Sequence, residues 1–217
     1  MDPKIAEWNE RYSDAEYLFG KEPNAFLASQ RERFMPGMKV LSVADGEGRN
    51  GVWLAQLGLD VLAVEAAPRA IDKARQLAAE RGVNLAHECA DLLTWDWGSE
   101  RFDAIVAIFI QFVGPELRAQ MFADMQRALK PGGLLLLEGY RLEQLSYATG
   151  GPKEPANLYT AAALREAFAS LQILHLAEYD AYIEEGSRHR GMSALIDLVA
   201  RKPTAEYSLE AEPAVAG

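Results

Sequence analysis

The sequence predicts a single α/β domain built on a mostly parallel sheet. The chain has 217 residues, a length that suits one domain. Strand-like and helix-like segments alternate through most of it, which is typical of strands flanked by helices. Hydrophobic residues make up 49% and charged residues 25% of the sequence, a balance typical of a folded globular protein.

The first half of the chain alternates apolar runs with segments of helical periodicity. Short apolar runs bounded by glycine or polar residues indicate strands buried in a sheet. Apolar residues three and four positions apart indicate helices that pack one face on it, and Pro68 is well placed to begin such a helix. In chain order we expect a strand at 39–44, a helix at 50–57, a strand at 60–65, a helix from Pro68 onward, and strands at 84–87 and 102–109.

A helix beginning at Pro115 opens the second half. Its apolar residues follow helical spacing, so we expect them all on the buried side; they are Leu117, Met121, Phe122, Met125 and Leu129. The segment Lys130–Gly133 predicts a turn that ends this helix and leads into a strand at 134–138. We further expect a helix at 160–169 that Thr160 caps, followed by strands at 171–181 and 192–201 joined by a polar segment.

The charge balance excludes several classes of partner. The chain has 22 Lys and Arg against 32 Asp and Glu, a net charge of −10, which repels nucleic acid and anionic membrane surfaces. Apolar stretches such as 104–110 are far shorter than the roughly 18 to 20 residues that span a bilayer. Met1–Lys4 does not resemble the start of a secretory signal. One cysteine, Cys89, and three histidines argue against a disulfide and against structural zinc, so we expect a cytoplasmic protein without metal.

The most informative segment is Val40–Leu54, in which a predicted strand runs through a glycine loop into a helix. It contains Gly46-x-Gly48-x-x-Gly51, and Glu65 follows about 20 residues further on. Taken literally, this satisfies the dinucleotide-binding fingerprint and indicates an NAD(P)-dependent oxidoreductase. Asp45 and Glu47, however, place two carboxylates in the loop that would have to hold a pyrophosphate. A cofactor with positive charge and no phosphate suits this loop better.

Several segments in a fixed order resemble the motifs of class I S-adenosylmethionine-dependent methyltransferases. They are Val40–Gly48, Glu65, Ala90–Leu92, the strand ending near Gln111, and Lys130–Gly133, and the resemblance covers about residues 38–202. It implies a Rossmann-like domain with a seven-stranded, mostly parallel sheet, an antiparallel last strand and helices on both faces. The sequence departs from the pattern at Ser42, where an acid is usual, and at Ala44, where a glycine is usual.

The N-terminal residues carry a second resemblance. Trp8–Tyr12, Tyr17–Gly20 and Pro23–Leu27 resemble the N-terminal segment of the tellurite-resistance and thiopurine methyltransferase-like branch. We therefore expect residues 1–36 to form a helical, aromatic lid over a core of residues 37–202. Residues 203–217 are acidic and rich in small side chains, and we expect them to be disordered.

The resemblance also implies a cofactor and its contacts. S-adenosylmethionine would be the methyl donor and S-adenosylhomocysteine the product, with no metal. The backbone at Gly46 and Gly48 would approach the methionine part, Glu65 would hold the ribose hydroxyls, and Asp91 with Leu92 would border the adenine. The remaining expected cofactor contacts are Tyr12, Asn24, Ala44, Asp45, Asn50, Ala66, Ile108 and Gln111.

The acceptor end is predicted by topology, because open α/β sheets bind ligands at the carboxyl ends of their strands. Tyr140 and Arg141 leave the fifth strand there, and the connection between the last two strands carries Arg188, His189 and Arg190. His189, Arg141 and Tyr140 are therefore the catalytic candidates. The alternative is that Arg188, His189 and Arg190 only form the solvated tip of a hairpin. We expect a small-molecule acceptor, with a thiol or a selenium or tellurium oxyanion as the favoured class. A neutral acceptor would require a base such as His189.

Two other functions and the oligomeric state stay open at this point. One is the NAD(P)-dependent oxidoreductase. The other is a cofactor-binding protein without transfer activity, which Ser42 and Ala44 suggest. The sequence is compatible with a monomer and with a homodimer.

Overall fold

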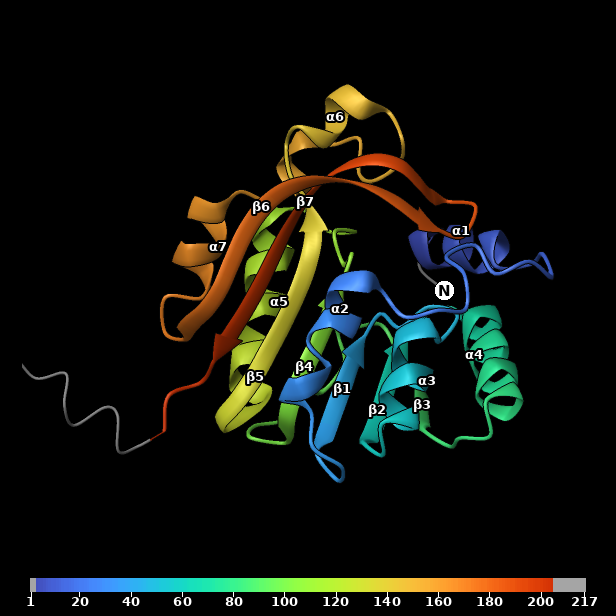
Figure 1. The fold of residues 1–217 in the computed structure, drawn as a ribbon, viewed down its shortest axis with the longest axis horizontal. Coiled ribbons are helices and arrows are strands. Elements are labelled where there is room, and N and C mark those ends of the chain that lie inside the picture. Colours follow the sequence, from blue (N-terminus) through green and yellow to red (C-terminus); the bar gives the residue numbers. More distant parts are fainter. Residues whose placement is uncertain (1–2, 205–217) are drawn as a thin grey trace, which may run out of the picture.

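A seven-stranded sheet forms the centre of the computed structural model, which describes residues 3–204 (Figure 1). The strand order is β3-β2-β1-β4-β5-β7-β6, and β7 alone of these strands runs antiparallel to its neighbours. This confirms the predicted mostly parallel sheet with an antiparallel last strand. The strands are β1 (Lys39–Val43), β2 (Asp60–Glu65), β3 (Ala86–Cys89), β4 (Phe102–Ile108), β5 (Leu129–Tyr140), β6 (Gln172–Glu185) and β7 (His189–Arg201).

Helices cover both faces of the sheet, as expected. The first strand shows how the sequence divides the core: Leu41 and Val43 point to one face and Val40 to the other, because side chains alternate along a strand. The first face packs on α5 (Pro115–Ala128) and α7 (Ala161–Ala167), and the second packs on α2 (Ala25–Ser29) and α3 (Arg49–Gln56) (Figure 1). The remaining elements are α1 (Pro3–Arg11), α4 (Pro68–Glu80), α6 (Gln144–Tyr147) and two short 3₁₀ turns, η1 (Arg31–Arg33) and η2 (Pro155–Asn157).

Two predictions around β5 are wrong in part. Leu117 is 49% exposed, because the buried stripe of α5 begins only at Met121. The predicted turn Lys130–Gly133 is included in β5, where the pairing with β4 shifts register between Phe102 and Ala104. Gly132 keeps the positive φ of +79° that the turn prediction requires. Gly132 therefore has the backbone conformation of the predicted turn, but it lies within β5 and not before the strand.

The last two strands are longer than predicted. The polar segment expected to join them is mostly paired, with Glu184 opposite Arg190 and Glu185 opposite His189, so that only residues 186–188 turn. Arg190 also forms an ion pair of 3.1 Å with Glu184 across the two strands. Polar composition predicted a loop, but ladder hydrogen bonds come from the backbone and accommodate polar side chains on an exposed hairpin. β3 likewise lies two residues later than expected.

The predicted cap of the last helix is confirmed. The Thr160 hydroxyl accepts a hydrogen bond from the Ala163 N–H at 3.1 Å, at the start of α7. We expect Thr160→Ala to lower the free energy of unfolding by about 1 kcal/mol, because this N–H then lacks its partner. Urea unfolding measures this, with Thr160→Ser as the control that keeps the hydroxyl. An equal loss in both variants would assign the effect to packing of the threonine methyl group.

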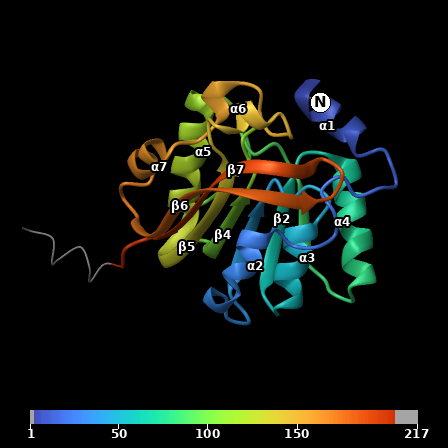
Figure 2. The ribbon, with the colours of Figure 1, turned by 45° about the horizontal axis from the view of Figure 1, so that its top comes forward.

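The tip of the β6–β7 hairpin reaches over the carboxyl ends of the parallel strands toward the N-terminal segment (Figure 2). The Arg188 N–H donates to the Leu18 carbonyl at 3.0 Å. Gly186 packs so closely that an added Cβ would lie 2.4 Å from the same carbonyl oxygen. The hairpin and the residues around Leu18 therefore form one cover over this edge of the sheet.

Most of the segment expected to be disordered, from residue 205 onward, lies outside the described residues. Within residues 3–204, none of the helices has both the length and the apolar character needed to cross a membrane.

Candidate active site

The glycine loop connects β1 to α3 at the carboxyl edge of the sheet. Its backbone enters the left-handed region at Ala44 (φ +48°), Gly46 (+58°) and Gly48 (+91°). Gly48 cannot carry a side chain, because an added Cβ would lie 2.6 Å from the Cβ of Ala74 on α4. Ala44 adopts a positive φ at the position where a glycine is usual in the family that the sequence resembles.

Glu65 ends β2 and is fixed against this loop. Its Oε2 accepts the Gly46 N–H and its Oε1 accepts the Ala67 N–H, both at 2.9 Å. The residue is only 9% exposed, and burial raises the pKa of its carboxyl. Each carboxylate oxygen can accept a second hydrogen bond, so the group remains able to bind two neighbouring hydroxyls.

The two loop carboxylates have different surroundings. Glu47 forms an ion pair with Lys73 and accepts the Phe19 N–H, so its charge is balanced by a residue of α4. Asp45 is buried, at 8% exposure, and accepts hydrogen bonds from Ser42 and from the Gly51 N–H. The electrostatic argument against a pyrophosphate therefore depends on Asp45 and no longer on Glu47.

Tyr12 covers the loop from the N-terminal side. It is 6% exposed, stacks on Trp8 with ring centroids 5.8 Å apart, and its hydroxyl would lie 3.3 Å from a Cβ added to Gly46. Burial, followed by the charge of Glu65, raises the pKa of Tyr12 well above 10, so the hydroxyl is a neutral donor. Tyr12 is thus in contact with the predicted cofactor loop.

Phe19 is held by the same loop. Its N–H donates to Glu47 at 3.3 Å, and its carbonyl accepts from the Arg49 guanidinium at 3.2 Å. Its ring lies 4.6 Å from the His189 ring. The N-terminal segment therefore joins the glycine loop to the hairpin tip.

His189 lies in an aromatic enclosure at the hairpin tip. It is 9% exposed, and its ring centroid lies 4.6 Å from those of Phe19 and Phe109 and 5.9 Å from that of Tyr140. Burial lowers the pKa of the imidazole below 6.5, so the ring is neutral at neutral pH and can accept a proton. Its Nδ1 lies 3.8 Å from Oε2 of Glu185.

Glu185 joins the hairpin to two other elements. Its Oε2 lies 2.8 Å from Nη1 of Arg49, at the start of α3, and its Oε1 accepts from the Ala25 N–H and from Asn24 Nδ2 at 3.2 Å each. Burial alone would raise the pKa of Glu185, but the neighbouring His189 imidazole and the Arg49 guanidinium outweigh it and hold the pKa at about 2. Glu185 is therefore a permanent anion beside His189.

The side chain of Asn24, one of the expected cofactor contacts, is engaged in hydrogen bonds within the protein. Its Nδ2 donates to Glu138, its Oδ1 caps α2 by accepting the Leu27 N–H at 2.9 Å, and its own N–H donates to Asn50. Burial, followed by the charge of Asp197, raises the pKa of Glu138 well above its usual range. Asn24 and Asn50 thus join the N-terminal segment to α3 and β5.

The side chain of Gln111 connects the end of β5 to η2 through hydrogen bonds. Its Nε2 donates to the carbonyls of Tyr140 and Asn157 at 2.9 Å, and its Oε1 accepts the Tyr140 N–H at 2.6 Å. Ile108, three residues earlier in the chain, is 8% exposed and packs on the α2 face of the core. Gln111, an expected cofactor contact, therefore also holds the end of β5.

The expected adenine end lies beyond β3. Asp91 Oδ1 accepts the Leu93 N–H at 3.0 Å, and Leu92 is buried in the α5 face of the core. Ala66 is half-buried, and its carbonyl lies 3.8 Å from Cys89 Sγ. These residues border the same edge as Glu65, because the Ala90 N–H donates to the Glu65 carbonyl.

Two of the three arginines predicted at the acceptor end are engaged in ion pairs. Arg141 pairs with Asp180 and with Glu143, and Arg190 pairs with Glu184. Tyr140 is buried, and its hydroxyl has no hydrogen-bond partner within residues 3–204. Of the three catalytic candidates, the structure places His189 and Tyr140 in one enclosure and engages Arg141 in ion pairs.

Sequence reasoning missed Phe109 and Glu185 as residues of the site. Phe109 has a positive φ of +55° just after β4, a conformation that nothing in the sequence signals. Glu185 belonged to a segment predicted as a loop, and its partners Arg49 and Asn24 are more than 130 residues away. Only the three-dimensional fold brings these groups together.

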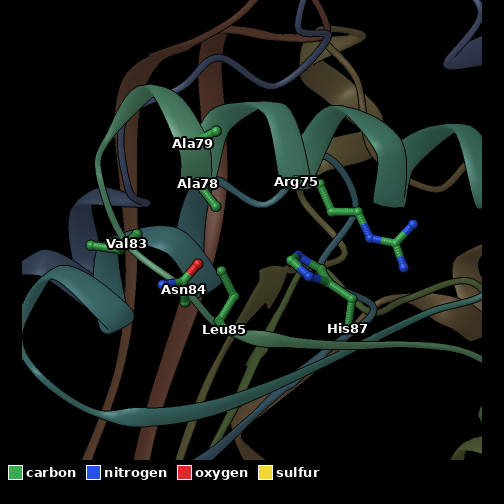
Figure 3. A pocket seen from close by; sticks show the side chains of 7 residues that line it. All are labelled: Arg75, Ala78, Ala79, Val83, Asn84, Leu85 and His87. Atoms are coloured by element: carbon green, nitrogen blue, oxygen red, sulfur yellow. The ribbon is translucent and has the colours of Figure 1, made fainter.

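Two surface hollows lie away from this site. One, of about 330 Å³, is bounded by α4 and β3 and lined by Arg75, Ala78, Ala79, Val83, Asn84, Leu85 and His87 (Figure 3). Another, of about 450 Å³, lies at the start of several strands, around Lys39, Asp60 and Phe102. Neither shares a lining residue with the site described above.

The chain matches one family model and several curated relatives over part of its length. Residues 40–133 match the family model described as a methyltransferase domain. The curated relatives are 25–33% identical over 95–119 residues, and four of them carry methyltransferase in their names. The chain spans only 36–54% of the length of these relatives.

Solved structures share the fold over nearly the whole chain. A protein described under "Conversion of a Disulfide Bond into a Thioacetal Group during Echinomycin Biosynthesis" has a TM-score of 0.75 at 20% identity, covering 95% of this chain and 96% of its own. The N-methyltransferase NodS from Bradyrhizobium japonicum in complex with S-adenosyl-L-homocysteine has a TM-score of 0.72 at 15% identity, covering 93% and 100%. TehB from Haemophilus influenzae has a TM-score of 0.67 at 19% identity, covering 92% and 67%. The chain thus has the fold of S-adenosylmethionine-dependent methyltransferases.

Proposed function

We propose that the protein transfers a methyl group from S-adenosylmethionine to a small-molecule acceptor. The observation that carries the proposal is the Glu65 carboxylate, held by backbone N–H groups beside a glycine loop whose domain matches methyltransferases. When bound, the cofactor supplies a methyl group on a sulfonium and needs no metal to activate it. Glu65 fits a ribose with two hydroxyls, because each of its oxygens can accept a further hydrogen bond.

The protein's own residues orient the reactants and exclude water. Tyr12 and Phe19 close the N-terminal side of the site, and Phe109 and Tyr140 enclose the acceptor end. An acceptor held there in line with the sulfonium needs little further catalysis if it is already an anion. If it is a neutral thiol, the His189 imidazole can accept its proton, with Glu185 stabilising the imidazolium that forms.

Within this activity we favour a thiol acceptor over a selenium or tellurium oxyanion. Free cations favour an oxyanion, and Arg141 and Arg190 are both engaged in ion pairs, which leaves only Arg188 of the three arginines predicted at this end. The structural neighbour associated with conversion of a disulfide into a thioacetal also supports sulfur chemistry. The N-terminal motifs and the likeness to TehB support the tellurite-resistance-like branch. Selenite and tellurite should therefore be tested as acceptors beside thiols.

Glu65→Ala is expected to weaken S-adenosylmethionine binding by about 1–3 kcal/mol, because two ribose hydroxyls lose a charged acceptor. Isothermal titration calorimetry measures this, and Glu116→Ala, which removes an exposed carboxylate of α5, is the matched control. Unchanged affinity in Glu65→Ala would remove the ribose assignment. Binding of NAD(H) in place of S-adenosylmethionine would favour the oxidoreductase. Cofactor binding without turnover on thiols, selenite or tellurite would favour a non-catalytic binding protein.

A further inference from the structure

Two acidic side chains lie opposite one another inside the sheet. Glu138 on β5 pairs with Asp197 on β7 in the strand register, and the two residues are only 2% and 6% exposed. Both point to the face that packs on α2, because Leu136 and Val199, two positions away on each strand, belong to that side of the core. Two carboxylates directly opposite each other repel, and burial increases the cost of each charge.

No cation balances these two acids. Neither forms an ion pair within residues 3–204, and Arg49 and His189 both face Glu185 instead. The polar groups that face the pair come from three elements; they are Asn24 of the N-terminal segment, Tyr140 on β5, and Tyr179 and Glu185 on β6. Burial and the nearby carboxylates raise the pKa of both phenols above 10, so the phenols are neutral. The surroundings of the pair therefore contain one further anion and no free cation.

A proton is the remaining way to balance the pair. Tyr179 and Asn24 donate to the two oxygens of Glu138, whereas Oδ1 of Asp197 is buried and has no hydrogen-bond partner within the described residues. Burial raises the pKa of both carboxyls, and the charge of Asp197 raises that of Glu138 further. The Glu138 carboxyl in turn lowers the pKa of Asp197, which is the effect of a hydrogen-bond donor and not of an anion. Such a proton belongs to the pair and not to one residue.

The pair also lies beneath the cover that the hairpin tip and the residues around Leu18 form. The Asn24 amide that donates to Glu138 also donates to Glu185 in the hairpin. Asn24 begins α2, and the Ala25 N–H donates to Glu185 at 3.2 Å. A second charge on the pair would add to the charge of Glu185 around one amide group, and the repulsion would act on the contact between the N-terminal segment and the hairpin.

We infer that Glu138 and Asp197 share one proton in the folded protein and that this proton keeps the cover closed, so that its loss in alkaline solution opens the site. The inference concerns access to the site and does not depend on methyl transfer, so its test is separate from that of the proposed function. Because burial raises the pKa of both acids above their ordinary values, the contribution of the proton to closure is complete in acid and is lost as pH rises through the raised pKa.

Infrared spectroscopy tests the shared proton directly, because a protonated carboxyl has a C=O stretching band that ionised carboxylates lack. Near pH 7 we expect the wild type to show a band that is missing from Asp197→Asn and from Glu138→Gln. In either variant an amide replaces one acid and can donate to the other, so the remaining carboxylate needs no proton. Glu178→Gln, which removes an exposed acid of β6, is the matched control and should keep the band.

Hydrogen exchange tests the opening. Between pH 7 and 10, the protection factors of residues 17–27 and 183–190 should fall at least about tenfold in the wild type, since opening linked to one proton becomes up to tenfold more favourable with each pH unit above the pKa. Protection factors already account for the base-catalysed exchange of an open chain, and β4 should keep its protection throughout. In Asp197→Asn and Glu138→Gln the protection of the cover should not change with pH, and in Glu178→Gln it should follow the wild type.

Each part of the inference can fail by itself. The same infrared band in the wild type and in both variants would overturn the shared proton. Unchanged wild-type protection up to pH 10 would overturn its role in closing the cover. A pH response of wild-type size in Asp197→Asn or Glu138→Gln would assign the opening to another group and contradict the proposal. Circular dichroism shows whether each variant is folded, and either folded variant suffices for the comparison.

Discussion

Replacing His189 by glutamine is expected to lower kcat for a neutral thiol acceptor by about 10²- to 10⁴-fold, because no other described group of the enclosure is a neutral base at neutral pH. Glutamine keeps a polar side chain of similar reach but cannot take the proton. Burial lowers the pKa of His189 from 6.5, so the wild-type rate should rise as pH passes through that lowered value and then level off. The pH profile of the variant should lack this step.

A matched pair of acceptors separates a catalytic role from a structural one. A thiol acidic enough to be ionised already needs no base, so His189→Gln should affect its turnover far less than that of an alkyl thiol. Arg190→Gln, one residue further along the same hairpin and exposed, should leave both rates close to the wild type. Equal loss for both thiols would show that His189 only holds the enclosure together.

The sequence predicted the parts of this fold that depend on local pattern. The apolar run of β4 and the glycine loop after β1 are predictable because a buried strand and a positive φ restrict the residues that fit. The Thr160 cap is predictable for the same reason, since it satisfies an N–H three residues away. Each of these features involves residues close together in the chain.

The parts that could not be predicted depend on contacts between distant residues. Glu185 appeared to be a loop acid, and its role comes from Arg49 and His189, which only the hairpin brings to it. Arg141 appeared to be a free cation, and Asp180 on β6, which is separated from β5 by β7, pairs with it. Charge placement along a sequence shows which groups exist but leaves open which of them neutralise one another.

Arg49→Met is expected to lower the free energy of unfolding by about 3–5 kcal/mol, because it leaves the Glu185 carboxylate buried without its cation. Both side chains are almost fully buried, at 7% and 11% exposure, so water cannot replace the guanidinium. Denaturant unfolding at pH 7 measures the loss. Arg49→Met/Glu185→Gln should be less destabilised than Arg49→Met alone, since the double variant buries no unpaired charge. Equal stabilities would mean that the pair contributes nothing beyond packing.

The pH dependence of the same variant checks the cause. The folded-state pKa of Glu185, about 2, lies below its ordinary value of 4.5, so the pair stabilises the wild type above pH 4.5 and this contribution is lost as pH falls toward 2. Without Arg49, the buried carboxyl should have a higher pKa and become neutral by protonation as the solution is acidified. The difference in stability between wild type and Arg49→Met should therefore narrow below pH 4.5. Because Arg49 also holds the Phe19 carbonyl, the variant should expose the N-terminal segment to hydrogen exchange, which links the stability of this pair to closure of the site.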